Sequence, residues 1–229
     1  MDETLKIEVL NDDFSQYDLN FKSIVIGNSS VGKSCLTIKA IKDVFEPTYS
    51  ATVGFDFFTF NIKINDQIIK LHIWDTCGQE EYKSLVSNFY RNSSLAILVY
   101  AINDKASFKN LEMWLNEVKT LCSPDVKIIL IGNKNDLESN REVSKEEEKK
   151  FCEDHNFDLF FETSAKTGLN AQKVFIEGTK ILYKEYLKCK EKESKSDFLP
   201  LRTKYEDKCT STIDDDESIK RRNKKGKCC

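Results

Sequence analysis

Residues 27–34 read Gly27-Asn28-Ser29-Ser30-Val31-Gly32-Lys33-Ser34, which fits the pattern G-x-x-x-x-G-K-[ST] of a phosphate-binding loop. An apolar run at 21–26 precedes the motif, and a segment typical of a helix follows it at 35–41. Small residues let the backbone wrap around phosphates with its N–H groups pointing inward, and the helix adds the positive end of its dipole. We therefore predict that residues 27–34 and the adjacent Cys35 bind phosphates, with Lys33 at the β- and γ-phosphates and the Ser34 hydroxyl on Mg²⁺. The alternative is a Gly/Ser-rich turn that only joins a strand to a helix.

The composition fits one ordinary domain with appendages, because the chain has 229 residues. A net charge of −3 predicts no nucleic-acid partner, although residues 219–229 carry six basic and no acidic side chains. The eight cysteines form no C-x-x-C pair and there are two histidines, so we expect free thiols in a reducing, cytosolic compartment. The N-terminus lacks a signal-peptide pattern, and the longest apolar run, at 95–102, is too short to span a bilayer.

Predicted strands and helices alternate along most of the chain. Strands are expected at 19–26, 54–64, 67–74, 95–102, 126–131 and 157–161, the second and third forming an antiparallel hairpin. Helices are expected from the phosphate loop to Asp43, at 82–90 and 107–121, from Ser144, and from 169 to about 188. This order predicts an α/β fold, a doubly wound, mostly parallel six-stranded sheet with one antiparallel hairpin strand and helices on both faces. Residues 1–18 are predicted to be a flexible acidic arm, 19–188 the domain, and 189–229 a disordered tail.

The stretch Trp74-Asp75-Thr76-Cys77-Gly78-Gln79-Glu80 directly follows an apolar predicted strand. The Asp75 carboxylate can hold Mg²⁺, because that ion prefers oxygen ligands. Gly78 would let a backbone N–H approach the γ-phosphate, and Gln79 could orient a water molecule for in-line attack. An acidic turn at the end of a strand is the alternative interpretation of the same residues.

Two further loops indicate which base is bound. In Ile131-Gly132-Asn133-Lys134-Asn135-Asp136, the Asp136 carboxylate could accept hydrogen bonds from guanine N1–H and the 2-amino group, which adenine cannot offer. In Glu162-Thr163-Ser164-Ala165-Lys166, the backbone N–H of Ala165 could donate to guanine O6, and Lys166 could cover the base. All four loops come just after predicted strands, and open α/β sheets bind their ligands at the carboxyl ends of strands.

With these motifs in this order, the chain resembles the Ras superfamily of small GTPases from about Tyr17 to Tyr186. The resemblance implies a P-loop NTPase fold of the small-GTPase type that binds GTP or GDP with Mg²⁺. It implies that Thr52 binds Mg²⁺ and senses the γ-phosphate, with Thr48 as a competing candidate. Gln79 is implied to position the attacking water. The resemblance also implies which residues bind the guanine nucleotide: Phe45, Tyr49, Asn133, Lys134, Asp136, Ser164, Ala165 and Lys166.

Within that superfamily the chain resembles the Rab branch. The evidence is Gly54-Phe55-Asp56-Phe57, Lys70-Leu71-His72-Ile73-Trp74-Asp75, Phe89-Tyr90-Arg91, and the terminal pair Cys228-Cys229. That terminal pair looks like the double-cysteine ending that receives two geranylgeranyl groups. Two lipid chains beside a basic cluster would anchor the protein to the cytoplasmic face of intracellular membranes, from which it would cycle to the cytosol.

The resemblance implies a GTP-hydrolysing switch in vesicle trafficking, slow alone and stimulated by a GTPase-activating protein (GAP). Its implied partners are an exchange factor, a GAP, an escort protein of the GDP-dissociation-inhibitor (GDI) type and effectors. A Ras-like signalling GTPase and a GTP-binding scaffold with negligible hydrolysis are the alternatives, and a P-loop kinase or ATPase is a more distant one. Cys77 stands where the family usually has alanine, and Ser29 and Ser30 replace the glycines of Ras-like loops.

Overall fold

Over its described residues, the protein folds around one sheet of seven strands, in the order β1-β3-β4-β2-β5-β6-β7. The computed structural model describes residues 5–11, 16–47, 52, 54–78 and 88–193. The strands are β1 (Ile7–Leu10), β2 (Leu19–Ile26), β3 (Phe55–Ile64), β4 (Gln67–Thr76), β5 (Leu95–Ala101), β6 (Lys127–Asn133) and β7 (Leu159–Glu162). The helices are α1 (Lys33–Lys42), α3 (Lys105–Lys109), α4 (Leu111–Leu121), α5 (Lys145–His155), α6 (Ala171–Glu193) and the 3₁₀ helix η2 (Asn135–Asn140).

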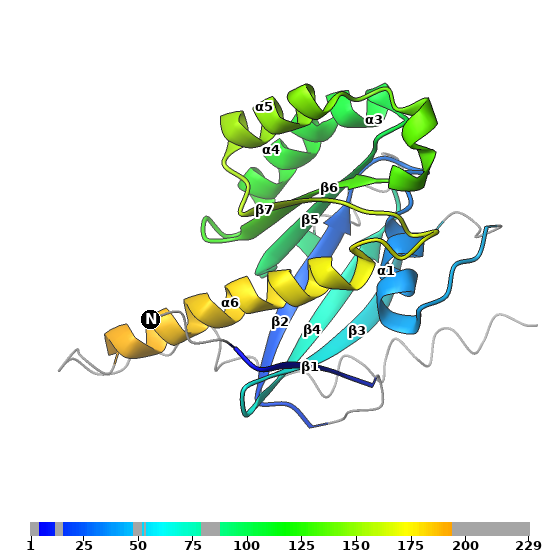
Figure 1. Ribbon diagram of the computed structural model, residues 1–229. Helices are drawn as coiled ribbons and strands as arrows, with labels where there is room; N and C mark the ends of the chain where they lie inside the picture. The colour runs from blue at the N-terminus through cyan, green and yellow to red at the C-terminus, as the bar shows by residue number, and fades with distance from the viewer. Residues whose placement is uncertain (1–4, 12–15, 48–51, 53, 79–87, 194–229) are drawn as a thin grey trace, which may run out of the picture.

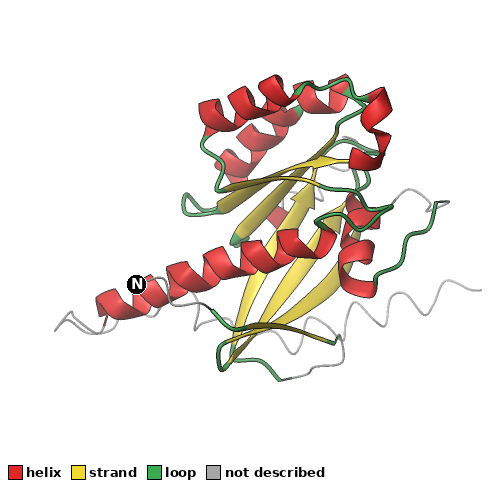
Figure 2. Ribbon diagram, in the orientation of Figure 1, coloured by secondary structure: helices red, strands yellow, loops and turns green. Residues whose placement is uncertain are grey.

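Helices cover both faces of the sheet, as Figure 1 and Figure 2 show. Successive residues of a strand point to opposite faces, so the wholly buried β5 contributes to two cores. Leu95, Ile97 and Val99 belong to the core that includes side chains of α1 and α6. Ala96, Leu98 and Tyr100 belong to the core that includes side chains of α4. The prediction of an α/β sheet between two helical layers is therefore confirmed.

Strand β1 corrects the prediction for the N-terminal arm and adds a seventh strand to the predicted six. It pairs antiparallel with the far end of β3, from Ile7 opposite Ile64 to Leu10 opposite Asn61. Without β1, this end of β3 would be the edge of the sheet and would expose unpaired N–H and C=O groups. The four residues of β1 show no regular pattern from which a strand could be predicted. The strand forms because it pairs with β3, more than fifty residues away in the sequence.

Two helices differ from their predicted extent. The helix predicted at 107–121 is divided at Asn110 into α3 and α4. Asp104 caps α3 by accepting hydrogen bonds from the backbone of Ala106 and Ser107, which starts the first segment before the predicted helix. Helix α6 continues to Glu193, so regular structure extends past the domain boundary predicted at 188.

Other predictions have mixed outcomes. The predicted capping box at the start of α5 is confirmed, because the Glu147 N–H donates to Ser144 Oγ over 3.3 Å and Glu147 Oε2 accepts from Ser144 N–H over 3.1 Å. Most of the helix predicted at 82–90 lies outside the described residues, as do parts of the acidic arm and the tail from 194 onward. Within the part of the chain that the structure describes, no helix is both long and apolar enough to cross a membrane.

Candidate active site

A cavity of about 410 Å³ lies where the loops after β2, β4, β6 and β7 meet. This is the position expected for a ligand in an open α/β sheet, at the carboxyl ends of strands. Most of the predicted site residues line it: Ser29, Ser30, Gly32, Lys33, Ser34, Cys35, Phe45, Thr52, Gly78, Asn133, Lys134, Asp136, Ala165 and Lys166. Glu46, Pro47, Thr76, Cys77 and Leu137 line it as well and were not among the predicted site residues.

The Lys33 ammonium is held inside the loop that precedes α1. Its Nζ donates to the carbonyl oxygens of Gly27 over 2.9 Å and Asn28 over 2.8 Å. Only 5% of the residue is exposed, and burial lowers the Lys33 pKa to about 8, although Asp75 acts in the opposite direction. A phosphate beside this ammonium would replace the solvation that burial removes, so the position is suited to an anionic ligand.

Three oxygen-bearing side chains meet beside Lys33. Ser34 Oγ lies 2.7 Å from Thr52 Oγ1, and the Ser34 hydroxyl also donates to Asp75 Oδ2. The other carboxylate oxygen, Asp75 Oδ1, is buried and has no hydrogen-bond partner among the described residues. Burial raises the Asp75 pKa to about 7, although the bond from Ser34 and the charge of Lys33 lower it. Two hydroxyls and a carboxylate with an unused oxygen fit Mg²⁺, which prefers such ligands.

Gly78 packs directly on the phosphate-binding loop. A Cβ atom at this position would lie 2.2 Å from Ser29 N and 2.6 Å from Asn28 O. Only glycine lets the two backbones approach so closely. The loop after β4 is therefore in contact with the loop after β2, next to the Lys33 end of the cavity.

Hydrogen bonds join the loops after β6 and β7 to each other and to the phosphate-binding loop. Asn133 Nδ2 donates to Val31 O over 2.8 Å, and the Thr163 hydroxyl donates to Asn133 Oδ1 over 3.0 Å. The Ser164 hydroxyl donates to Asp136 Oδ1 over 2.6 Å. Asn133 thus orients two loops at once, and Asp136 is fixed in place where it lines the cavity.

The remaining predicted residues lie behind the cavity wall or outside the described residues. Gly27, Asn28, Val31, Asp75 and Ser164 are described and support residues of the wall through the contacts above. Tyr49, Gln79, Cys228 and Cys229 lie outside the described residues, so their roles stay predictions.

Sequence reasoning missed two residues that hold the site. Thr163 lies within a motif that was recognised, but its bond to Asn133 gave no separate signal. Trp114 of α4 has 4% exposure, and its Nε1–H donates to Asn28 Oδ1 over 2.8 Å. In the sequence Trp114 is one more large apolar residue of a helix, and its partner lies 86 positions away.

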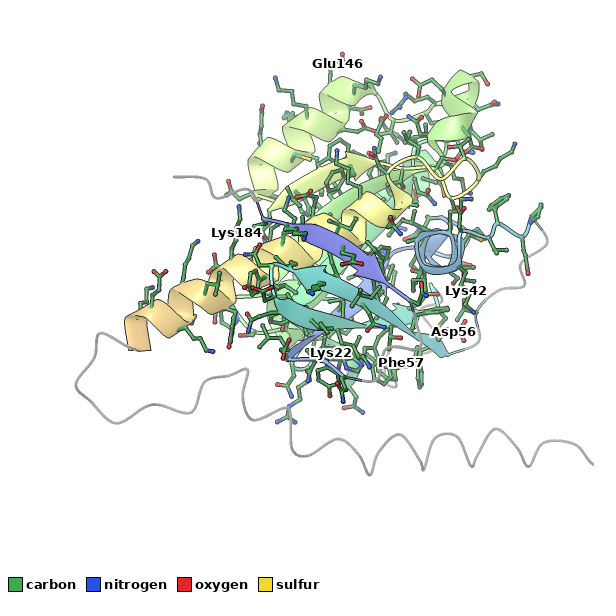
Figure 3. The ribbon with its side chains drawn as sticks, turned by 60° about the horizontal axis from the view of Figure 1, so that its bottom comes forward. Lys22, Lys42, Asp56, Phe57, Glu146 and Lys184 are labelled. Carbon is green, nitrogen blue, oxygen red and sulfur yellow. The ribbon has the colours of Figure 1, made fainter. Side chains whose placement is uncertain are left out.

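Aromatic side chains form a second feature, on the face of β3 and β4 opposite α6. We call Phe55, Phe57, Trp74 and Phe89 the aromatic surface. The ring centroids of Phe57 and Trp74 are 5.1 Å apart, and those of Phe55 and Phe89 are 4.3 Å apart. Phe57 is 39% exposed, and Figure 3 shows it with Lys22 on the side of the sheet away from α6. The alternate side chains Phe58 and Phe60 pack with the core on the other face.

Comparison with known proteins adds independent evidence. A family profile described as "Ras family" matches residues 22–184. The chain is 43% identical over 171 residues to "Ras-related protein Rab-2B" from Dictyostelium discoideum, a match that covers 75% of this chain and 84% of that protein. It is also 43% identical over 159 residues to "Ras-related protein Rab-13" from Bos taurus and from Mesocricetus auratus, covering 69% of this chain and 78% of each relative.

Proposed function

Because the chain belongs to the Ras family, we propose that the cavity beside Lys33 is where it binds and hydrolyses GTP. The chain is a Rab-type small GTPase that acts as a switch in vesicle trafficking. As an enzyme it converts GTP and water to GDP and phosphate. The relatives do not favour a Ras-like signalling role or a scaffold without hydrolysis. One observation carries the proposal: a single cavity joins the buried Lys33, the oxygen cluster at Ser34 and the Asp136 loop.

The Lys33 end of the cavity would receive the phosphates. Lys33 would contact the β- and γ-phosphates, and backbone N–H groups of residues 29–35 would point toward them. Ser34, Thr52 and Asp75 would hold Mg²⁺, which would offset the negative charge of the phosphates when bound. Asp75 Oδ1 has no hydrogen-bond partner in the described part of the chain, and Ser34 Oγ lies close to Thr52 Oγ1, and both observations support this assignment.

The Asp136 end would receive guanine. Asp136 would accept hydrogen bonds from N1–H and the 2-amino group, while the Ala165 N–H would donate to O6. Phe45, Lys134 and Lys166 would enclose the base, and Asn133 would join this end to the phosphate-binding loop. The bond from Ser164 to Asp136 supports the proposal, because it leaves the carboxylate with a defined orientation.

Hydrolysis would release the segments that sense the γ-phosphate. Gln79 would orient the attacking water, and residues 45–54 and 78–85 would be ordered by GTP and relax in the GDP state. No arginine is among the described residues that line the cavity, so we expect a GAP to supply one in trans. In the GTP state the aromatic surface beside these segments would bind effectors, since its exposed Phe57 offers an apolar contact.

The Gln79→Leu variant tests the enzymatic part of the proposal. Leucine cannot orient a water molecule, so single-turnover GTP hydrolysis should fall at least about tenfold, and stimulation by GAP extract should be lost. Nucleotide affinity should stay within about twofold of the parent, because the side chain is assigned no ground-state contact. In both proteins unlabelled GTP, but not ATP, should displace labelled GTP. Equal hydrolysis in variant and parent would exclude the role of Gln79, and displacement by ATP would exclude that of Asp136.

We also propose that the C-terminal end anchors the protein to membranes. Cys228 and Cys229 would each receive a geranylgeranyl group, and the basic residues at 220–227 would add attraction to the anionic cytoplasmic leaflet. An escort protein of the GDI type would return the lipidated protein to the cytosol, and an exchange factor would reload it with GTP. The relatives support membrane association in general terms.

Changing both terminal cysteines to serine should move the protein from membranes to the cytosol. One lipid chain gives only marginal membrane binding, so the single variants should show partial release. Fractionation and imaging of the tagged protein measure the shift, and mass spectrometry of the parent should find two geranylgeranyl groups. As a control, Cys189→Ser on α6 should leave the distribution unchanged. Persistent membrane binding without either cysteine would contradict the proposed anchor.

A further inference from the structure

Arg141, just after η2, sits at the centre of three carboxylates. Its Nη2 donates to Glu162 Oε1 over 2.6 Å, its Nη1 to Glu148 Oε1 over 2.9 Å, and its Nε to Glu138 Oε2 over 3.0 Å. The Arg141 side chain is 12% exposed, and those of Glu148 and Glu162 are 2% and 18% exposed. Ion pairs that are this well buried are costly to break, because the remaining charge loses its partner.

One branch of this cluster leads to the two loops assigned to guanine. Glu162 ends β7 and directly precedes Thr163-Ser164-Ala165-Lys166. Its second oxygen, Oε2, accepts a hydrogen bond from Asn135 Nδ2 over 2.8 Å, and Asn135 stands between Lys134 and Asp136. The Asn135 backbone N–H also donates to Thr163 O over 2.9 Å. Arg141 therefore fixes Glu162, and Glu162 in turn fixes the residue beside Asp136.

The other branch leads away from the cavity. Glu148 of α5 accepts a hydrogen bond from the Tyr100 hydroxyl over 2.6 Å, deep in the core below β5. Burial raises the Glu148 pKa and nearby Glu162 acts in the same direction, although the bond from Tyr100 and the charge of Arg141 lower it. Glutamine at this position would remove one ion pair of Arg141 but keep the shape of the side chain, so its cost should fall on stability.

We propose that Arg141 is a positioning residue for guanine recognition, acting through Glu162 and Asn135 on Asp136. The inference rests on the proposed function of the cavity. Two hydrogen bonds from one base to one carboxylate require that the carboxylate keep its position, and small displacements weaken such bonds steeply. Loss of the hydrogen bond from Arg141 to Glu162 would let the loops after β6 and β7 shift against each other. The bond to the 2-amino group would then be weakened, and discrimination against bases that lack this group would fall.

Arg141→Lys tests the proposal, because lysine keeps the charge but its single ammonium group cannot reproduce the bonds of the planar guanidinium to three carboxylates. GDP and GTP should dissociate about tenfold faster, the size expected for a weakened charge-assisted hydrogen bond. The preference for GDP over IDP, whose base lacks the 2-amino group, should fall by several-fold. Hydrolysis of GTP already bound should stay within twofold of the parent in single turnover. Stopped-flow release of fluorescent nucleotides and equilibrium competition give the three values.

Glu148→Gln is the matched control on the other branch. It should lower the melting temperature while leaving nucleotide release and the GDP-to-IDP ratio within twofold of the parent. Lys180→Met removes an ion pair of intermediate exposure on α6, with Glu177 at 2.8 Å, and should likewise leave both values unchanged. If Arg141→Lys does not fold, Glu162→Gln provides the same test, because it removes the charge that Arg141 holds.

Three outcomes would overturn the inference. Arg141→Lys could melt earlier yet release nucleotide and prefer GDP over IDP as the parent does, which would make Arg141 purely structural. Glu148→Gln could change the base preference as much as Arg141→Lys does. The effect would then not depend on the contact between Arg141 and Glu162. Parent protein that binds GDP and IDP equally would contradict the inference too. A parent that binds no guanine nucleotide at all would instead refute the proposed function.

Discussion

The Asp136→Asn protein is expected to bind GTP roughly 10³-fold or more weakly than the parent and to bind XTP in its place. The Asp136 carboxylate accepts two hydrogen bonds from guanine in the proposed complex. An asparagine amide group would face the 2-amino group of guanine with a donor of its own, so a buried donor would stay unpaired. Xanthine has a carbonyl oxygen at that position and can accept the new hydrogen bond. Equilibrium competition with a fluorescent nucleotide at constant Mg²⁺ measures both affinities.

The control for this substitution is Asp154→Asn on α5, at an exposed position outside the cavity lining. It makes the same change of charge and should leave the base preference unchanged. If Asp136→Asn kept the parent's preference for GTP, the guanine end of the cavity would have to be assigned to other residues. The hydrogen bond from Ser164 to Asp136 Oδ1 would then only hold the loops after β6 and β7 together, with no role in binding the base.

The Gly27→Ala protein should be less stable than the parent by roughly 3–5 kcal/mol. A Cβ atom on Gly27 would lie 2.0 Å from the carbonyl oxygen of Val99 in β5, at a backbone φ of +142°. Backbone cannot move aside as a flexible side chain can, and L-residues rarely adopt this conformation. The first residue of the phosphate-binding loop should therefore tolerate no side chain. Urea denaturation with and without GDP measures the loss.

Gly54→Ala separates the two causes of that loss. Gly54 also has a positive φ, +81°, but nothing lies within 4 Å of a Cβ atom built there. This variant should lose only the roughly 1–3 kcal/mol that belongs to backbone conformation. A loss of equal size in both variants would mean that contact with Val99 contributes nothing, and that the backbone conformation alone requires glycine at Gly27.

Much of the fold and the site could be predicted because the decisive patterns are local. The apolar residues at 95–101 indicate a strand buried on both faces, and that is where β5 lies. Each of the four motifs follows a predicted strand, so the topology of a mostly parallel sheet brings them to one edge. The predictions failed where the structure depends on a distant partner, as for β1, which pairs with β3. They also failed where it depends on a single turn, as at Asn110, which divides the helix predicted at 107–121.

The sequence by itself determined the chemistry of the cavity: an ammonium at Lys33, hard oxygens at Ser34 and Asp75, and a carboxylate at Asp136 for a base with two donors. Tertiary structure alone decided what holds these groups in position. Trp114 contacts Asn28 across 86 positions, and Arg141, just after η2, connects Glu148 of α5 to Glu162 of β7. The physical reason is that residue type and short-range pattern specify chemistry and backbone conformation. Which side chains become neighbours depends on how helices pack on the sheet, and no local pattern contains that information.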